Sequence, residues 1–450
     1  MIVSPDVPHI LAVNPWIHDF SAYDVWAKPA GLFTLVSILR LHGYRVSYID
    51  CLDRFHENAG ASDPKKRGGR GPYLKTEIPK PKALANIPRR YSRYGIRPEW
   101  FKADLASTPR PDLVLVTSMM TYWAPGVQET IRMVKAVYPE SPLLLGGIYA
   151  SLCSEHATHF SGADQIVPGA CESRILDVAG AYTRWHATPM FDPGDLDTYP
   201  FPAFDLQRKI GYIPLLTSRG CPYSCEYCAS HRLSPIRLER SAESVVEEIR
   251  YWQSTFAVSD FALYDDAFLV NSDRHALPLL EKLAGTELSI RIHTPNALHI
   301  RQVTREAARL MFKTGFETIR LGLETADPAS RRTMDDKVTI KEFRRAVAVL
   351  KAAGFNAGQI GVYLLVGLPE QSMDSVKQAI KEVKDTGATP IPAYYSPIPH
   401  TALWEKAVGS SRYDLPSDPV FTNNSILPCR KESFSWEEMS RIKRWVKAEC

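Results

Sequence analysis

The chain has 450 residues, of which 45% are hydrophobic and 23% are charged, and 54 basic against 50 acidic residues leave a net charge of +4. This composition is ordinary for a globular protein long enough for two or three domains, and the small net charge gives no indication of a nucleic-acid partner. The N-terminal stretch lacks a basic segment followed by a long apolar core, and the longest uncharged run, 113–127, is interrupted by Thr, Ser and Pro and is too short to cross a bilayer. We therefore expect neither a signal peptide nor a membrane span.

The cysteines are few and mostly isolated. There are eight in the whole chain, and only three of them stand close together. Disulfide-stabilised secreted domains have denser, more regular cysteine patterns. We therefore expect a reducing compartment and a cytoplasmic protein.

Residues 1–200 alternate apolar strands with amphipathic helices. Helices are expected early in 31–51 and at 126–139, and strands at 9–16, late in 31–51, at 111–120, at 141–150 and within 163–173. Continuous apolar strands between such helices predict a doubly wound, Rossmann-like α/β domain with a parallel sheet covered on both faces. Ligands of such sheets bind beyond the carboxyl ends of the strands. The expected strand ends supply the candidates Asn14, Ser118, Gly146 and Gly147.

A basic insertion, 60–105, interrupts this domain. Residues 64–97 hold eleven Lys or Arg and one acidic residue, with frequent Pro and Gly. We expect a long loop without regular structure, which is typical of either a solvated surface or a functional lid. Its arginines would suit an anionic partner in the second case.

From residue 201 to 405 the strand–helix pattern repeats six times. The expected strands lie at 212–220, 260–266, 288–296, 317–325, 357–369 and 388–399, and the helices between them at 241–254, 273–284, 303–314, 340–353 and 372–387. Six such units predict a partial, open version of the eightfold α/β barrel, whose catalytic groups gather at the carboxyl ends of the strands. Residues 406–450 are expected to form a short helical C-terminal extension.

Three cysteines follow the first strand of this barrel. Cys221, Cys225 and Cys228 have the spacing C-x3-C-x2-C. Three thiolates this close suit a soft metal site. With His231 they would make a closed Cys3His zinc site, whereas a [4Fe–4S] cluster held by three cysteines keeps one iron open for another ligand.

This motif resembles the signature of the radical S-adenosylmethionine (SAM) superfamily, in which an aromatic residue, here Tyr227, precedes the third cysteine. The resemblance implies a [4Fe–4S] cluster on Cys221, Cys225 and Cys228, whose open iron binds SAM. It also implies reductive cleavage of SAM to a 5′-deoxyadenosyl radical. An external electron donor of the flavodoxin or ferredoxin type is then required as a partner.

Further positions in the barrel match the places where this superfamily binds SAM. Asp266, or else its neighbour Asp265, follows the second strand and would hold the methionine ammonium group. Glu324 ends the fourth strand and would accept the ribose hydroxyls. The fifth-strand segment 360–372 would lie beside the adenine.

Other polar residues near the strand ends have no role that the sequence alone decides. They either face the substrate or close turns and pack, and they are His293, Asn296, Tyr394, Tyr395 and His400.

The N-terminal domain resembles the cobalamin-binding domain that precedes many radical SAM barrels. The matching segments are 28–50, 112–121, 143–151 and 167–173. The resemblance implies cobalamin as a cofactor, contacted from Asn14, Ser118, Gly146, Gly147 and Glu172. The chain lacks the D-x-H-x-x-G motif that supplies a histidine ligand to cobalt, and many members of the class lack it as well.

Together these resemblances imply a cobalamin-dependent radical SAM methyltransferase that acts on an unactivated carbon of a small molecule or peptide. One alternative is a radical rearrangement, cyclisation or oxidation without methyl transfer, and another is a non-catalytic iron–sulfur or corrinoid sensor. A methylthiotransferase would need three more cysteine ligands, and Cys51, Cys153 and Cys171 show no suitable local motif.

Overall fold

The computed structural model describes residues 7–60, 62–327, 338–430 and 436–447. The chain divides into two compact units. The first unit comprises Met1–Gly211 and Ser417–Thr422, and the second comprises Tyr212–Pro416 and Asn423–Cys450. Among the described residues, no helix has the length and hydropathy that a membrane span requires.

The first unit is built on a five-stranded parallel sheet with the strand order β3-β1-β6-β7-β8. The strands are β1 (His9–Asn14), β3 (Arg45–Asp50), β6 (Leu113–Val116), β7 (Leu143–Leu145) and β8 (Gln165–Ile166). Asn14 pairs with Asp50, and Val13 pairs with Val116. The chain therefore winds outward in both directions from β1, and the switch between β1 and β6 is where sheets of this kind bind ligands. The predicted doubly wound α/β domain is confirmed.

Helices connect these strands as the alternating pattern predicts. They are α1 (Ala30–Leu41), α2 (Pro98–Ser107), α3 (Ala124–Val137), α4 (Ile148–Leu152), α5 (Ser154–Phe160) and α6 (Ile175–Thr183). Helix α3 buries Val127, Ile131 and Val134, whose spacing puts them on one helical face against the core of the sheet. The expected strand at 141–150 is too long, because the chain turns at Gly147 with φ +91° and enters α4.

The insertion at 60–105 is not a structureless loop, and that prediction is wrong. It contributes β4 (Lys75–Glu77), β5 (Ser92–Tyr94) and the start of α2, and β5 pairs antiparallel with both β4 and β2 (Ile17–Asp19). Two of its arginines lie over aromatic rings, Arg89 over Phe20 and Arg93 over Trp16. Three-residue strands carry no periodic signal, and β2, the partner that joins β5 to the rest of the unit, is more than 70 residues away along the chain, so local sequence could not reveal them.

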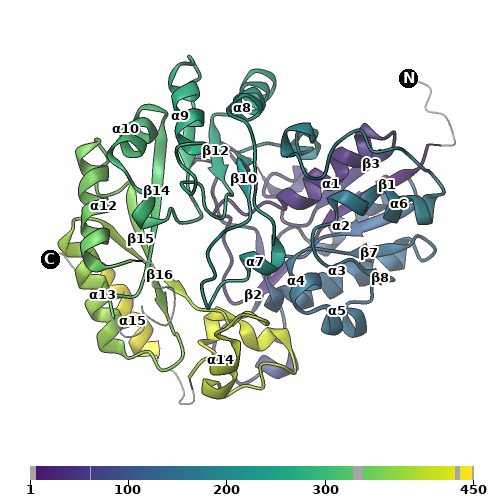
Figure 1. The fold of residues 1–450 in the computed structure, drawn as a ribbon. Coiled ribbons are helices and arrows are strands. Elements are labelled where there is room, and N and C mark those ends of the chain that lie inside the picture. The colour runs from purple at the N-terminus through teal and green to yellow at the C-terminus, as the bar shows by residue number, and fades with distance from the viewer. Residues whose placement is uncertain (1–6, 61, 328–337, 431–435, 448–450) are drawn as a thin grey trace. The chain divides into compact units, whose positions relative to one another are not determined.

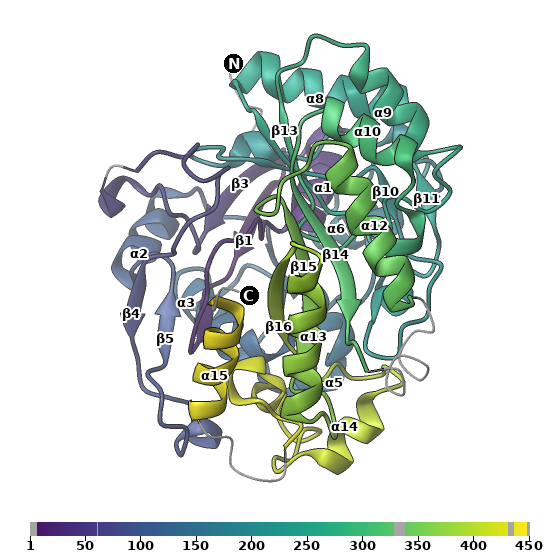
Figure 2. The same ribbon diagram turned by 90° about the vertical axis from the view of Figure 1, so that its left-hand side faces the viewer.

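The second unit contains the predicted partial barrel, six parallel strands in the consecutive order β9, β12, β13, β14, β15 and β16. These strands are β9 (Ile213–Leu215), β12 (Asp260–Leu263), β13 (Arg291–His293), β14 (Phe316–Glu324), β15 (Ile360–Val366) and β16 (Thr389–Tyr394). The helices between them are α8 (Ala242–Phe256), α9 (Ala276–Ala284), α10 (Arg305–Lys313), α12 (Ile340–Ala352) and α13 (Met373–Asp385). They lie along one side of the curved sheet (Figures 1 and 2).

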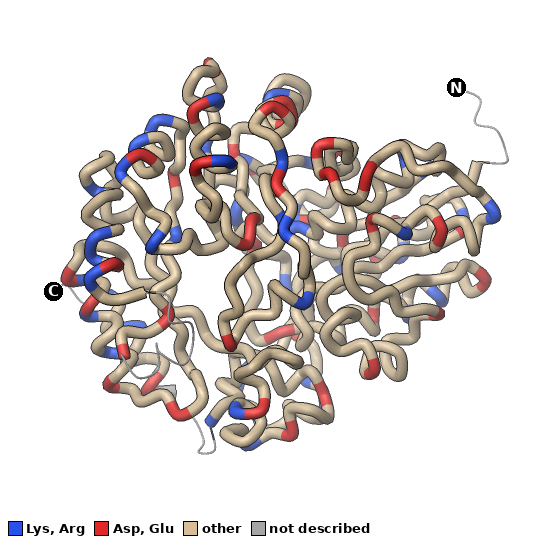
Figure 3. The backbone as a smooth tube through the Cα atoms, viewed as in Figure 1, with Lys and Arg blue, Asp and Glu red and all other residues tan. Residues whose placement is uncertain are grey.

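Local signals explain why these helices begin where they do. Side-chain oxygens of Ser241, Thr304 and Ser372 accept hydrogen bonds from the first turns of α8, α10 and α13. Thr339 and Glu342 form a reciprocal capping box at the start of α12. After β16 the chain continues through α14 (Trp404–Ser410) to α15 (Trp436–Lys447), as expected for a helical extension. Basic and acidic residues are interspersed along the chain (Figure 3).

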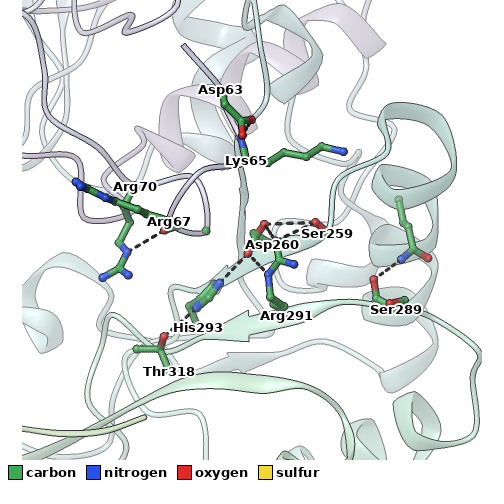
Figure 4. A network of polar contacts seen from close by, with 12 residues as sticks. Asp63, Lys65, Arg67, Arg70, Ser259, Asp260, Ser289, Arg291, His293 and Thr318 are labelled. Carbon is green, nitrogen blue, oxygen red and sulfur yellow. Dashed lines mark hydrogen bonds and ion pairs between the residues drawn. The ribbon is translucent and has the colours of Figure 1, made fainter. Parts of the chain in front are cut away.

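An ionic network centred on the buried Asp260 lies at the amino end of this barrel (Figure 4). The carboxylate of Asp260 accepts hydrogen bonds from Arg291 at 2.5 and 2.8 Å and contacts Nε2 of His293 at 3.0 Å. Nδ1 of His293 lies 3.0 Å from the hydroxyl of Thr318. Burial opposes the ionised form of Asp260, but the hydrogen bonds from His293 and Arg291 outweigh it and lower the pKa of the carboxyl. His293 is therefore held in this network, and both of its ring nitrogens have partners there.

Candidate functional site

The cysteine loop is closed at its base by a short antiparallel ladder. Strand β10 (Ser218–Arg219) pairs with β11 (Leu238–Glu239), and Nη1 of Arg237 donates to the carbonyl of Gly220 at 2.9 Å. Gly220 has φ +82°, and a Cβ there would lie 2.7 Å from the carbonyl oxygen of Ile236. Only glycine allows the two sides of the loop to approach this closely. The loop therefore leaves the carboxyl end of the first barrel strand as a defined structure.

The three cysteines share this loop and differ in exposure from most other cysteines of the chain. Cys221, Cys225 and Cys228 are partly exposed, whereas Cys51, Cys171 and Cys429 are buried. The amide of Cys228 donates to the carbonyl of Cys225 at 3.0 Å, so these two residues sit on one turn. Across the described part of the chain, no three His, Cys, Asp or Glu side chains are arranged so that they could hold a metal ion. The structure thus brings the thiols into one loop and does not gather them around one point.

The structure separates the two adjacent carboxylates that follow β12. Asp265 is 3% exposed and accepts hydrogen bonds from the amide of Thr217 at 3.1 Å, the hydroxyl of Thr217 at 2.6 Å and the hydroxyl of Ser218 at 2.6 Å. Its two oxygens are therefore engaged with the segment that leads into the cysteine loop. Nε2 of His275 lies 2.9 Å from the same Thr217 hydroxyl and completes the cluster.

Asp266 contacts the cysteine loop itself. Its carboxylate accepts hydrogen bonds from the amide of Gly220 at 3.2 Å and the hydroxyl of Ser230 at 3.0 Å. Ser230 also contacts Cys228, whose thiol donates to the Ser230 hydroxyl at 3.3 Å. Burial raises the pKa of Asp266 despite the hydrogen bonds from Ser230 and Gly220, so the carboxylate would gain from a nearby cation. Asp266 thus combines contact with the loop and a preference for a positive partner.

Glu324 ends β14 in a left-handed backbone conformation. Its φ is +62°, and the pairing of β14 with β15 shifts register between Gly322 and Glu324. A Cβ at Gly322 would lie 2.6 Å from Oε1 of Glu324, so the carboxylate folds back over this glycine. Residues held in this conformation are uncommon and cluster at functional sites. The strain at Glu324 is consistent with the role predicted for it.

The fifth-strand segment ends in a turn that one side chain fixes. Gly367 follows β15 with φ +90°, and its amide donates to Oε1 of Gln371 at 2.8 Å. Nε2 of Gln371 donates in turn to the carbonyl of Leu365 at 2.9 Å. The backbone beside the predicted adenine position is thereby held rigid.

The remaining predicted residues of the barrel fall into different environments. The side-chain amide of Asn296 donates to the carbonyls of Tyr264 and Asp265 at 3.0 and 3.2 Å, so Asn296 connects the ends of β12 and β13. Tyr395 is 3% exposed, and burial raises the pKa of its hydroxyl. Tyr227 and Tyr394 are partly exposed, and His231 and His400 are exposed.

The carboxyl edge of the first unit is closely packed around the backbone of Ser118. Its hydroxyl donates to the carbonyl of Gly146 at 2.6 Å, and its own carbonyl accepts from the amide of Ile148 at 2.8 Å. A Cβ at Gly147 would lie 2.2 Å from the Ser118 carbonyl oxygen. Ser118, Gly146 and Gly147 therefore do lie together at the ends of β6 and β7.

The other two predicted residues of this unit make contacts of their own. Asn14 donates to the carboxylate of Asp50 at 2.8 Å across β1 and β3, and it is buried. Glu172 is buried in the single 3-10 turn Glu172–Arg174. A cavity of about 280 Å³ beside Asp50 is lined by residues that the strand-end argument did not select. They include Lys28, Asp53, Asp104 and Arg208.

Sequence reasoning missed the residues that hold the cysteine loop from behind. These are Thr217, Ser218, Ser230 and Arg237, whose contacts are described above. Only Ser230 gave a usable signal, because it stands two residues from Cys228. The others act through bonds to carboxylates or carbonyls that are distant along the chain.

Comparisons with known proteins agree with this geometry. Residues 215–383 match the family model of the radical SAM superfamily. An uncharacterized methyltransferase of Pyrococcus horikoshii is 26% identical over 268 residues, which is 56% of this chain and 55% of that protein. The anaerobic magnesium-protoporphyrin IX monomethyl ester cyclase of Rubrivivax gelatinosus is 23% identical over 67% of this chain and 59% of its own length. The chain thus spans little more than half of these relatives.

A solved structure extends the likeness to nearly the whole chain. The radical S-adenosylmethionine methyltransferase TsrM from Kitasatospora setae, solved with cobalamin and a [4Fe–4S] cluster bound, matches with a TM-score of 0.65 and 17% identity. The match covers 90% of this chain and 79% of TsrM. At this identity the likeness establishes the fold. Residues 215–383 in the second unit therefore have the features of a radical SAM domain, and the chain as a whole has the fold of TsrM.

Proposed function

We propose that the chain is a radical SAM enzyme that uses cobalamin to transfer a methyl group from SAM to an unactivated carbon of its substrate. The observation that carries the proposal is the loop with three partly exposed cysteines at the carboxyl end of a barrel that matches the radical SAM family model. The methyltransferase-named relative and the TsrM fold support the methyl-transfer part.

The donor set of the loop fits an iron–sulfur cluster. Three thiols within eight residues are soft ligands. Cysteines elsewhere in the described chain are poor competitors because partial or complete burial raises the pKa of their thiols, to about 12 for Cys153 and Cys429. When bound, the cluster would supply the electron that cleaves SAM. That electron would come from an external donor of the flavodoxin or ferredoxin type. The chain's own task is then to orient SAM and to keep water from the reacting atoms.

The structure favours Asp266 over Asp265 as the residue that holds the methionine ammonium group. Asp265 already accepts three hydrogen bonds from Thr217 and Ser218, so it positions the base of the loop. Asp266 lies against the loop. A charge-assisted hydrogen bond from an ammonium group would offset the burial that disfavours its ionised form and raises its pKa. Glu324 would accept the ribose hydroxyls from the end of β14.

This assignment is tested by replacing each carboxylate with its amide. We expect Asp266→Asn to weaken SAM binding, measured by calorimetry on the reconstituted protein, while changing the melting temperature little. We expect Asp265→Asn to lower the melting temperature more, because it leaves buried donors with a poorer acceptor. The opposite pattern would exchange the two roles.

The first unit fits a corrin ring through backbone rather than through a side-chain ligand. The ends of β6 and β7 present Gly146 and Gly147, which are partly exposed and have no side chain to obstruct a flat macrocycle. Asn14, Ser118 and Glu172 remain the polar groups proposed to contact cobalamin. Binding without a protein imidazole on cobalt is consistent with the absence of the histidine motif.

Anaerobic reconstitution with iron, sulfide and a corrinoid tests the proposed function. We expect bound iron, sulfide and corrinoid in the absorption and electron paramagnetic resonance spectra. With a strong reductant we expect SAM to yield 5′-deoxyadenosine. We also expect S-adenosylhomocysteine, which reports methyl transfer whatever the acceptor. A protein that binds no corrinoid and forms only 5′-deoxyadenosine would refute methyl transfer.

A radical cyclisation or oxidation is the second candidate, and the likeness to the Rubrivivax cyclase favours it. Such an enzyme would cleave SAM without transferring the methyl group of SAM to the substrate. SAM carrying a deuterated methyl group separates the two, because only a methyltransferase adds that label to product.

A further inference from the structure

The segment 295–302, which follows β13, is fixed to the barrel at several points. The carbonyl of Pro295 accepts a hydrogen bond from the hydroxyl of Tyr363 on β15 at 2.9 Å. The amide of Leu298 donates to the carbonyl of Arg320 on β14 at 2.8 Å, and Leu298 is 2% exposed. The segment is therefore a rigid part of the carboxyl edge of the sheet.

Two side chains of this segment contact the cysteine loop through one residue, Tyr223. The imidazole of His299 stacks on the ring of Tyr223, with centroids 4.3 Å apart and planes inclined by 17°. Nε2 of Gln302 donates to the hydroxyl of Tyr223 at 3.3 Å. The stack fixes the plane of the phenol, and the hydrogen bond fixes its rotation within that plane.

Tyr223 stands midway between two cysteines of the loop. It lies two residues after Cys221 and two residues before Cys225, on a stretch where Pro222 and Ser224 are exposed. The neighbouring residues on either side therefore give this stretch little anchorage by burial. A tyrosine ring held on both its face and its hydroxyl supplies that anchorage.

We propose that His299 and Gln302 are positioning residues that, through Tyr223, hold the loop in the conformation that presents Cys221 and Cys225 as ligands. This inference rests on the proposed function, because it requires that the loop bind a cluster. Their contacts with the loop run through Tyr223, so both would act on the retention and the environment of the cluster. Groups that orient metal ligands in this way strongly affect metal retention.

The first unit provides a matched control for a merely structural stack. His56 and Trp100 have centroids 5.0 Å apart and planes inclined by 13°, and His56 also contacts Asp104. His56→Ala removes a comparable stacked histidine that belongs to the other unit. If a general loss of stability caused iron loss, His56→Ala and His299→Ala would both lose iron faster. If positioning of the loop is the cause, only His299→Ala would lose iron faster.

The experiment compares the full-length, reconstituted wild type with His299→Ala, His299→Phe, Tyr223→Phe and His56→Ala. The measurements are iron per chain, the rate of iron loss to a ferrous chelator, the electron paramagnetic resonance spectrum of the reduced protein and the melting temperature. We expect His299→Ala to lose iron about 10-fold faster than the wild type and to show an altered spectrum. His299→Phe keeps a stacking ring and should behave like the wild type. Tyr223→Phe keeps the stacked ring and loses the hydrogen bond to Gln302, and it should show a smaller increase in the rate of iron loss.

Three results would overturn the inference. One is an unchanged rate of iron loss and an unchanged spectrum in His299→Ala. The second is iron loss in His299→Phe as fast as in His299→Ala, because the stack would then not be the cause. The third is equal acceleration in His56→Ala. If the wild type itself takes up no iron, the proposed function fails and this inference fails with it, a result distinct from the other three.

Discussion

The two units have sheets of the same kind, and their carboxyl edges are built differently. In the first unit the edge is made of backbone, with Ser118 bonded to Gly146 and Gly147 packed against Ser118. In the second unit the edge carries a loop of three thiols, which contacts Asp266 through the amide of Gly220 and His299 through the ring of Tyr223. Parallel topology thus decides where a ligand of such a sheet is expected, and the loops decide whether backbone surface or thiol side chains are presented there.

Removing one thiol from the cysteine loop should have the largest effect, and removing a thiol from the first unit should have little. We expect Cys225→Ala to lose its cluster and all SAM cleavage, because two thiolates cannot replace the three that hold the iron. Cys153→Ala in the first unit should retain iron and cleavage, since burial raises the pKa of that thiol to about 12. Iron analysis and 5′-deoxyadenosine formation are the measurements. Loss of iron in Cys153→Ala would point instead to a second cluster in the first unit.

The amino end of the barrel should be important for stability and not for ligand binding. Asp260→Ala removes the anion that bonds the buried His293 and the exposed Arg291, and we expect the free energy of unfolding to fall by about 1–3 kcal/mol, as for a buried hydrogen-bonding group that loses its partner. The control is Asp385→Ala, which breaks an exposed pair with Lys381 and should cost about 0.5 kcal/mol. Denaturant titration measures both. Equal effects would mean that Asp260 contributes no more than a surface charge.

The first unit has its own buried ionic network, which predicts a dependence on pH. Burial opposes the ionised form of Glu129, but hydrogen bonds from His18 and Arg93 outweigh it and lower the pKa from 4.5 to about 2. A carboxyl with a lowered pKa stabilises the folded state above its ordinary pKa, and this contribution is lost as the pH falls from 4.5 toward 2. The shift corresponds to about 3 kcal/mol.

Glu129→Gln should therefore lower the melting temperature at pH 7 and flatten its decline between pH 5 and 3, measured by calorimetry. An acid decline as steep as that of the wild type would show that other carboxylates dominate. Arg90 provides the control, because its exposed pair with Glu77 spans 3.7 Å and Arg90→Ala should leave the profile unchanged.

Two adjacent glycines test whether the edge of the first unit is made of backbone. Gly147→Ala would place a Cβ 2.2 Å from the Ser118 carbonyl at φ +91°, and we expect a loss of about 1–3 kcal/mol in stability together with weaker corrinoid binding. At Gly146 a Cβ would meet its nearest neighbour at 3.5 Å, an ordinary contact, so Gly146→Ala should fold normally. Thermal unfolding and corrinoid titration distinguish them. A Gly147→Ala variant as stable as Gly146→Ala would contradict the close packing of Gly147 against the Ser118 carbonyl.

Much of the fold was predictable because its signals are local. Each barrel helix has an apolar face and several have a capping residue, so the six units could be read in order from the sequence. The insertion could not, because β5 acquires its strand conformation by pairing with β2 across more than 70 residues. Short strands of this kind depend on a partner that the neighbouring sequence does not reveal.

The candidate site divides in the same way. The spacing of Cys221, Cys225 and Cys228 by itself predicted a soft metal site, because thiols that close in sequence lie near one another in any fold. Only the tertiary structure decided that Asp265 supports Thr217 and Ser218 while Asp266 contacts the loop, and that His299 stacks on Tyr223. Those relations join residues 36 to 76 positions apart, and the hydrogen bonds and ring contact that define them exist only after the strands have aligned.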